Sequence, residues 1–595
     1  MVNHMNNSDL VFKLMDVFRR TPMAQEEQLK LSMQLLAWAY LSENQTLSER
    51  LRIKNYASST NEELEDLWGL LDLEVGIRDT LFLGVKPFQH ISNREIQDAI
   101  HLILNASSAG FIKELDLTDI VCEFRFCGEI AIPPEIADYL VALAELEEKT
   151  TIYLPWDGSG QLMGRVAMQS RCVYVETPST APYPFIIRLF HDEVDIAITN
   201  PIIQPKGIEG GKLRTFGTAI SFPPFGIKYD EKDIVNDWFN RFPEKTTNGT
   251  ILWIRHILAQ TKGLAVIAVP NTVLFSAGME KMLRQDLLSS RKVKAVISLP
   301  SKLLYSTGIS FSVLILSNEM PCHKVLFIDA ATTDFFKKSN KTRDTLSNLD
   351  ELIAISTGKQ SSKYGLQVAV EDILNNDSQL QPSHYVMSEK DNQLNAKFSG
   401  MPKRRLDDVV TLVRPMNTLS DSDEEQGIVA YEIGAANMPE YGCINTHGRE
   451  VTISSDAVKK NQHQFLKSGD IVLIIKGSVG KLGIVGNAPP AGEGGWVAGQ
   501  SFIVLRLNTS SIDARWLFVF LRSEIGQALI SKLVSGATIS LLKLNDLPKL
   551  EIPVSDREAQ QQIIADFDQE VALQSQIDEI HKKQTELAKK YWSLD

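Results

Sequence analysis

Short apolar runs alternate with helical stretches between residues 151 and 300, and no other feature of this 595-residue chain constrains its fold as strongly. Parallel strands that are buried on both faces are continuous apolar runs, and the crossover between two of them needs a helix. The pattern therefore predicts an α/β domain over residues 146–395, with a mainly parallel sheet and helices on both faces. The runs are TIYL, RCVYVE, VDIAIT, TFGTAISF, GLAVIAVP and VKAVISLP.

The flanking regions have other patterns, and a chain of this length is too long for one core. Residues 1–145 carry apolar residues three and four apart, which predicts a helical domain. Residues 404–555 combine glycines with short β-like runs and predict a mainly β domain. Residues 556–595 lack Pro and Gly and predict one long helix that packs on a partner helix as a coiled coil. Its apolar stripe consists of Ile563, Phe567, Leu573, Ile577, Ile580, Leu587 and Tyr591.

The charge distribution is uneven. The net charge is −13, yet residues 451–550 contain eleven Lys or Arg against six Asp or Glu. A basic segment in an acidic chain is compatible with a local DNA-binding face. We find no apolar run long enough for a membrane span and no secretory signal, so we expect a cytoplasmic protein. Cys122 and Cys127 are the closest cysteines, and their spacing fits neither a redox pair nor a metal site.

A glycine-containing loop follows the first apolar run in TIYLPWDGSGQLMGR, residues 151–165. Gly158, Ser159 and Gly160 connect a predicted strand to a helix, where the backbone can turn sharply and approach a ligand. Glu176 ends the next strand, where a carboxylate can accept hydrogen bonds from the ribose of a nucleoside cofactor. Two interpretations stay open for the loop: a nucleoside site or a tight structural turn.

A second motif, TAISFPPFGIKY, occupies residues 218–229. Two prolines end the strand abruptly, at the edge where an open α/β sheet usually binds its ligand. Phe225 follows them and could stack on a flat ligand such as a base.

Together these motifs resemble the modification subunit of type I restriction–modification systems, an S-adenosylmethionine-dependent adenine-N6 DNA methyltransferase. The resemblance covers most of residues 1–395 and includes the stretch from GLAVIAVP to SVLILSN. It implies a Rossmann-like methyltransferase domain after a helical domain, with S-adenosylmethionine as cofactor. It also implies site residues: Pro155, Gly158, Ser159 and Gly160 in the cofactor loop, Glu176 as the ribose acid, and Phe222, Pro223, Pro224 and Phe225 at the catalytic motif.

The chain differs from this family in its cofactor loop and in its catalytic motif. Leu154 stands where the family has an acidic residue, and Asp157 and Gln161 replace small ones. Phe222 stands where the family has the catalytic Asn or Asp, whose oxygen accepts a hydrogen bond from the target adenine. Phenylalanine has no acceptor, so we expect a degenerate methyltransferase, unless a strand bulge lets Ser221 take the role.

Residues 404–595 resemble the DNA specificity subunit of the same systems. The resemblance rests on FLKSGDIVLIIKGSVGKLGIVG, VAGQSFIVLRL, SGATISLLKLNDLPKLEIPV and AQQQIIADF. It implies a target-recognition domain followed by a long helix, which is half of a specificity subunit, so a homodimer would restore the whole. Polar side chains on glycine-containing turns are the candidate DNA contacts: Lys476, Ser478, Lys481, Thr538 and Lys543.

Three functions fit these observations. The first is a sequence-specific DNA-binding component of a restriction–modification-like or antiviral defence system, with impaired methyl transfer. The second is an active adenine-N6 DNA methyltransferase. The third is a scaffold whose long helix recruits a nuclease effector. No GxxxxGK[ST] loop occurs, so cleavage or translocation would need a separate subunit.

Overall fold

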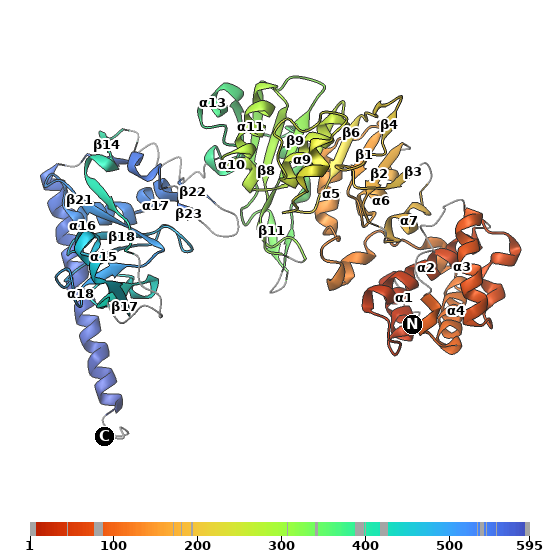
Figure 1. Cartoon of the computed structure of the whole chain (residues 1–595), viewed down its shortest axis with the longest axis horizontal. Helices are drawn as coiled ribbons and strands as arrows, with labels where there is room; N and C mark the ends of the chain where they lie inside the picture. The colour runs from red at the N-terminus through yellow and green to blue at the C-terminus, as the bar shows by residue number, and fades with distance from the viewer. Residues whose placement is uncertain are drawn as a thin grey trace. The chain divides into compact units, whose positions relative to one another are not determined.

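The computed structural model divides the chain into two compact units, Met1–Val386 and Met387–Asp595 (Figure 1). It describes residues 7–44, 46–75, 87–169, 172–179, 181–191, 194–305, 307–339, 343–386, 398, 400–416, 427–531, 533–535, 541–542, 544–554 and 556–589. The predicted fold class is confirmed: a helical N-terminal region, a central methyltransferase-like sheet, and a mostly β C-terminal region with a long final helix.

The first helices form because their apolar residues recur on one face. In α1 (Asn7–Phe18) Leu10, Leu14 and Phe18 are buried, and Ser92 caps α4 in a capping box with Glu95. These helices share one core with the first turns of α7, so they belong to the same unit as the sheet. The other bounds are α2 Gln25–Glu43, α3 Asn61–Val75, α4 Asn93–Ser108, α5 Pro134–Leu143, α6 Gln161–Ala167 and α7 Tyr183–Arg188.

The central sheet has the strand order β13-β10-β8-β9-β7-β6-β1-β2-β3. Most neighbours are parallel, but β9 runs antiparallel to β7 and β8, and β13 runs antiparallel to β10. The chain moves from β1 to β2 and β3, then returns to place β6 on the other side of β1. The strands are β1 Ile152–Pro155, β2 Val173–Thr177, β3 Val194–Ile198, β6 Thr218–Ser221, β7 Leu264–Pro270, β8 Val293–Ser298, β9 Phe311–Ser317, β10 Lys324–Asp329 and β13 Gly365–Ala369.

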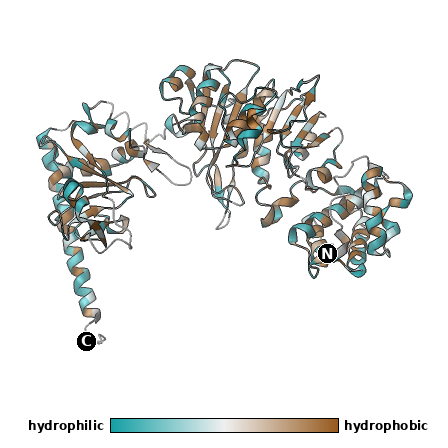
Figure 2. Cartoon of the chain, in the orientation of Figure 1, coloured by the Kyte–Doolittle hydropathy of each residue, from teal (hydrophilic) through white to brown (hydrophobic). Residues whose placement is uncertain are grey.

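Helices cover both faces in the middle of this sheet, which is why its central strands are mostly apolar and buried, whereas the edge strands β3 and β13 are partly exposed. In β1, Ile152 and Leu154 pack into one core, and Tyr153 packs into the other. The first core includes α5 and α6, and the second includes α9 and α11. Figure 2 shows the hydrophobic strands between these helices. The remaining elements are β4 Ile208–Glu209, β5 Lys212–Leu213, α8 Glu231–Val235, α9 Gly249–Ala259, α10 Thr272–Phe275, α11 Met279–Ser289, β11 Phe336–Lys338, β12 Asp344–Leu346, α12 Leu349–Ser356 and α13 Val370–Asn375.

The second unit contains a sheet of order β15-β21-β18-β19 and another of order β17-β16-β20. Strands β14 and β24 pair antiparallel and bring the two ends of the β region together. Two cores fill the space between the sheets and α16. The bounds are β14 Lys403–Arg405, β15 Val410–Val413, β16 Gly427–Ile433, β17 Arg449–Ser454, α15 Ser455–Lys460, β18 Ile471–Ile474, β19 Leu482–Ile484, β20 Trp496–Ala498, β21 Phe502–Leu507, α16 Ala514–Arg522, α17 Glu524–Ser531, β22 Val534–Ser535, β23 Leu541–Leu542 and β24 Glu551–Pro553.

The long helix α18 spans Arg557–Lys589, as the sequence predicts, and its second half extends past the β region (Figure 1). The expectation that one apolar stripe packs on a partner helix needs a correction. Phe567 is buried and Ile563 is partly buried in the core of the chain's own domain. The described part of the predicted stripe therefore divides into an inner part, which this domain already covers, and an outer part on the extending half; Tyr591 lies outside the described residues.

Candidate functional site

The loop Trp156–Gly160 connects β1 to α6 and packs against α7. Trp156 has φ 65°, a backbone region that bulky residues rarely adopt, and Gly160 has φ 79°. A Cβ atom on Gly160 would lie 2.9 Å from Pro184 Cα and 2.9 Å from Ile187 Cδ1 of α7. Both the backbone conformation and the close packing of α7 therefore require glycine at this position.

Asp157 holds this loop in place. Its Oδ1 accepts a hydrogen bond from the Gly160 N–H at 3.0 Å, and its Oδ2 accepts one from the Met163 N–H at 2.7 Å. Burial raises the pKa of Asp157 to about 6, although these hydrogen bonds act in the opposite direction. Ser159 is buried, and Gly158 is partly exposed. The carboxylate at this position thus ties the loop to α6.

Glu176 is the last residue but one of β2 and is fully buried. Its Oε2 accepts a hydrogen bond from the Tyr153 hydroxyl at 2.6 Å. Its Oε1 accepts three more, from the Tyr174 hydroxyl at 3.1 Å, the Lys206 N–H at 2.6 Å and the Gly207 N–H at 2.7 Å. Each carboxylate oxygen offers about two acceptor positions, so the protein's own donors saturate Oε1, while Oε2 accepts one bond.

A buried polar network extends from Glu176 to Asp237. The Tyr153 hydroxyl lies 2.7 Å from His256 Nε2, and Arg241 Nη1 lies 2.7 Å from His256 Nδ1. Burial and the charge of Arg241 lower the pKa of His256 well below 6.5, so its ring is neutral at pH 7. Because arginine only donates, Nδ1 accepts and Nε2 donates to the tyrosine. Arg241 also pairs with Asp237 at 2.8 Å and donates to two backbone carbonyls after β3.

The four residues after β6 begin with Phe222, whose ring is part of an aromatic cluster. Its centroid lies 5.6 Å from that of Phe225 and 5.5 Å from that of Phe311, which is buried at the start of β9. Pro223 is buried, Pro224 is exposed, and Phe225 is partly exposed. The Phe222 ring, at the position that the sequence resemblance assigns to a polar catalytic side chain, therefore packs among other aromatic rings.

Ser221, the residue before this motif, is fully buried at the end of β6. It pairs with Ile267 in regular register, without a bulge, and its hydroxyl donates to the Pro155 carbonyl at 2.9 Å. The Trp156 N–H in turn donates to the Glu176 carbonyl at 2.7 Å. The structure thus brings the ends of β1, β2 and β6 together, as expected for a sheet in which β1 lies between β2 and β6.

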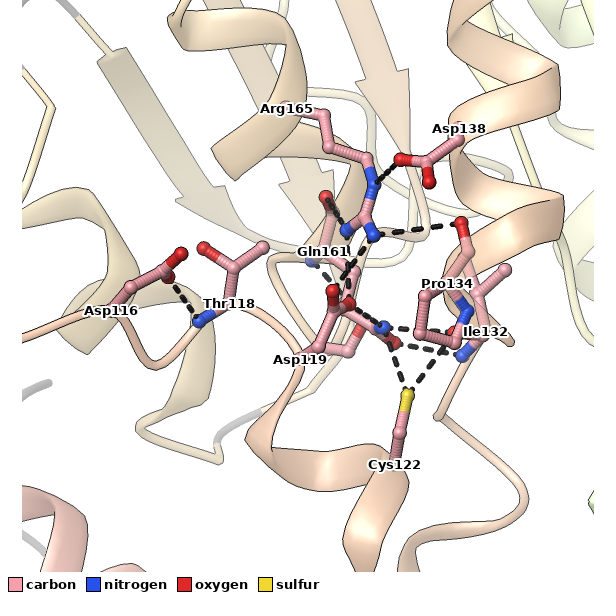
Figure 3. Close-up of polar contacts among 10 residues, drawn as sticks. Asp116, Thr118, Asp119, Cys122, Ile132, Pro134, Asp138, Gln161 and Arg165 are labelled. Atoms are coloured by element: carbon pink, nitrogen blue, oxygen red, sulfur yellow. Dashed lines mark hydrogen bonds and ion pairs between the residues drawn. The ribbon is translucent and has the colours of Figure 1, made fainter. Parts of the chain in front are cut away.

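Gln161 connects α6 to the helical region (Figure 3). Its Nε2 donates to Asp119 Oδ1 at 2.7 Å and to the Ile132 carbonyl at 2.8 Å, and its Oε1 accepts from the Ile132 N–H at 2.8 Å. One turn later, Arg165 pairs with Asp119 at 2.8 Å and with Asp138 at 2.6 Å. The larger residue at position 161 therefore fills the junction with polar contacts that a small residue could not make.

Three of the five candidate DNA contacts in the second unit lie on one hairpin turn between β18 and β19. Lys476, Ser478 and Lys481 are all exposed there. Gly477 and Gly480 have φ of 88° and 95°, which the turn requires. This turn is accessible to a phosphate backbone. Two other candidates lie outside the described residues: Thr538 and Lys543.

Sequence reasoning missed Tyr153, Arg241 and His256. Nothing in the sequence signals their connection, because the residues are up to about a hundred positions apart and each resembles an ordinary core or surface residue. Among the described residues, no group of three or more His, Cys, Asp or Glu could hold a metal ion. Within the same part of the chain, no helix is long and apolar enough to cross a membrane.

Two protein families match this chain. Residues 184–393 match the N-6 DNA methylase family, and residues 399–587 match the type I restriction modification DNA specificity domain. The first match includes the FPPF motif but begins beyond Gly160 and Glu176.

Solved structures share the fold. The methyltransferase subunit of a type I restriction-modification system from Streptococcus thermophilus is 16% identical, with a TM-score of 0.53 over 64% of this chain and 98% of that chain. A second structure, from work on a type I R-M system, is 16% identical, with a TM-score of 0.50 over 65% of this chain and 94% of that chain. At these identities the likeness concerns the fold alone.

Proposed function

Because this chain joins a domain of the N-6 DNA methylase family to a type I restriction–modification DNA specificity domain, we propose that it recognises a DNA sequence within a restriction–modification-like or antiviral defence system. In this proposal the specificity domain reads the DNA, and the methylase-like domain does not transfer methyl groups at a useful rate. DNA cleavage or translocation then belongs to a separate effector subunit.

The observation that carries the loss of methyl transfer is the aromatic cluster around Phe222. The family's Asn or Asp accepts a hydrogen bond from the amino group of the flipped-out adenine, and a phenyl ring cannot. Losing one preorganised interaction of this kind costs about 10²–10³ in rate. The contacts of Phe222 with Phe225 and Phe311 also fill space beside the motif. The full burial of Ser221 in regular strand register supports the same conclusion.

A methyl-transfer assay tests this part of the proposal. Incubation of the full chain with methyl-labelled S-adenosylmethionine and genomic DNA should leave the DNA unlabelled, while an active adenine methyltransferase labels the same DNA. Robust incorporation by the unmodified protein would contradict the proposal and favour an active enzyme.

DNA contact through the β18–β19 turn is tested by replacing Lys476 and Lys481 with Ala. Each lost phosphate contact should remove about one unit from the slope of log affinity against log salt, so the slope should fall by roughly two. The matched control replaces Lys459 and Lys460, which are exposed on α15 of the same unit. Fluorescence anisotropy over a salt series measures both. An unchanged slope in the turn variant, or an equal fall in the control, would mean that this turn does not contact DNA.

We further propose that two copies of the chain assemble through the outer half of α18. Leu573, Ile577, Ile580 and Leu587 are 45–65% exposed there, and their spacing of four, three and seven places them on one side of the helix. Ile563 and Phe567 are already covered by the chain's own domain, so the contact with the second copy involves these four outer residues. A dimer would place two recognition domains on inverted half-sites.

A further inference from the structure

Phe222 concerns the transfer of the methyl group. It does not determine whether the methylase-like domain binds S-adenosylmethionine. According to the family resemblance, Glu176 would accept the ribose hydroxyls and the loop from Pro155 to Gly160 would contact the cofactor. The structure describes Glu176 and every residue of this loop, and neither leaves room for the cofactor.

Glu176 does not fit this role. Three donors saturate Oε1, the Tyr153 hydroxyl donates to Oε2, and the side chain has no exposed surface through which a ribose could reach either oxygen. Two of these donors are backbone N–H groups of Lys206 and Gly207, which a side-chain rotation cannot remove. A ribose could approach only if the loop after β3 left the end of β2. That movement would also disturb Arg241, which donates to two carbonyls of the same loop.

The glycine loop does not fit either. The N–H groups of Gly160 and Met163, which would otherwise be free for a ligand, donate to the carboxylate of Asp157. The family has a small residue at this position, which could not make these bonds. Helix α7 packs directly on Gly160, and Asp157 and Ser159 are buried. The family match also begins only after this region, at residue 184.

We infer that the chain's own groups have replaced the cofactor: the Asp157 carboxylate binds the donors of the glycine loop, and the backbone at Lys206–Gly207 binds Oε1 of Glu176 and helps to bury its side chain. The domain therefore does not take S-adenosylmethionine, and DNA binding by this chain does not depend on that cofactor. The inference rests on the proposed assignment of the domain as methylase-like, but it is independent of Phe222.

Calorimetry on the full, unmodified chain tests the inference. Titration with S-adenosylmethionine, and separately with S-adenosylhomocysteine, to about 1 mM should give no saturable heat. The affinity for DNA should change less than twofold when 1 mM S-adenosylmethionine is added. Saturable binding in the micromolar range, or a cofactor-dependent DNA affinity, would overturn the inference.

Hydrogen exchange measures independently whether the backbone at Lys206–Gly207 stays bound to Glu176. The amides of Lys206 and Gly207 should exchange slowly, at the same rate with and without S-adenosylmethionine, because a buried carboxylate accepts both. Exchange as fast as that of the exposed Gly210–Gly211 turn, in the same hairpin region, would show that the site is open and would also overturn the inference. Cofactor binding without methyl transfer would overturn this inference alone, and binding with methyl transfer would overturn the proposed function as well.

Discussion

Replacing Ile577 and Ile580 with Gln should convert a dimer into monomers that bind DNA about 10²–10⁴ times more weakly. Glutamine keeps the helix, since it is a good helix former, but removes apolar surface from the outer half of α18. A dimer gains this factor because the second recognition domain binds at a high effective concentration once the first is bound. A monomer retains contact with one half-site.

Light scattering at micromolar concentration measures the mass, and anisotropy measures affinity for a site selected from random DNA. The matched control replaces Lys582 and Glu586 with Gln, because both lie on the opposite side of the same exposed helix. It should remain dimeric and bind normally. If the unmodified chain is itself monomeric with and without DNA, α18 does not join two copies, and an asymmetric, ungapped footprint would lead to the same conclusion. The outer stripe would then favour the scaffold function.

Replacing Arg241 with Ala should destabilise the first unit by roughly 3–5 kcal/mol, the usual cost of removing one partner from a buried ion pair. Arg241 and Asp237 have side chains only 2% and 6% exposed. The change leaves Asp237 Oδ1, two backbone carbonyls and His256 Nδ1 without their side-chain donor. The stability of Arg241→Lys should lie between that of the unmodified protein and that of Arg241→Ala, since an ammonium keeps the charge but cannot reproduce the planar fork of the guanidinium.

Differential scanning calorimetry of the full chain measures this effect as a lower transition temperature for the first unit. Arg19→Ala is the matched control, because Arg19 pairs with Asp16 in the same unit but is 81% exposed. An exposed pair of this kind contributes less than about 1 kcal/mol. Equal stability losses in the two variants would show that the network from Glu176 to Asp237 has no special role in holding the sheet edge together.

Much of the architecture could be predicted because it depends on local patterns. The alternation of apolar runs and helical stretches specified an α/β domain, since strands covered on both faces must be apolar throughout. The absence of Pro and Gly from residue 556 onward specified one long helix. Phe222 could be identified from its place beside two prolines, and its lack of an acceptor is a property of the residue type alone.

The state of the candidate cofactor site could not be predicted in this way. From sequence, Glu176 is an acid at the end of a strand, which is compatible with an open ribose site. Its donors come from positions 153, 174, 206 and 207, and only the pairing of β1 with β2 and the path of the loop after β3 bring them together. Asp157 likewise differs from the family residue in sequence, but its hydrogen bonds depend on how the loop turns.

The division of α18 follows the same logic. The sequence by itself determined that the helix forms and which of its residues are apolar, because helix formation and periodicity are local. Tertiary structure alone decided that Phe567 faces the chain's own core while Ile577 and Ile580 remain exposed, because burial depends on where the neighbouring domain ends. The sequence gives residue types and their spacing. Whether a polar group already has a hydrogen-bond partner, or an apolar face is already buried, depends on contacts between segments that are distant in the sequence.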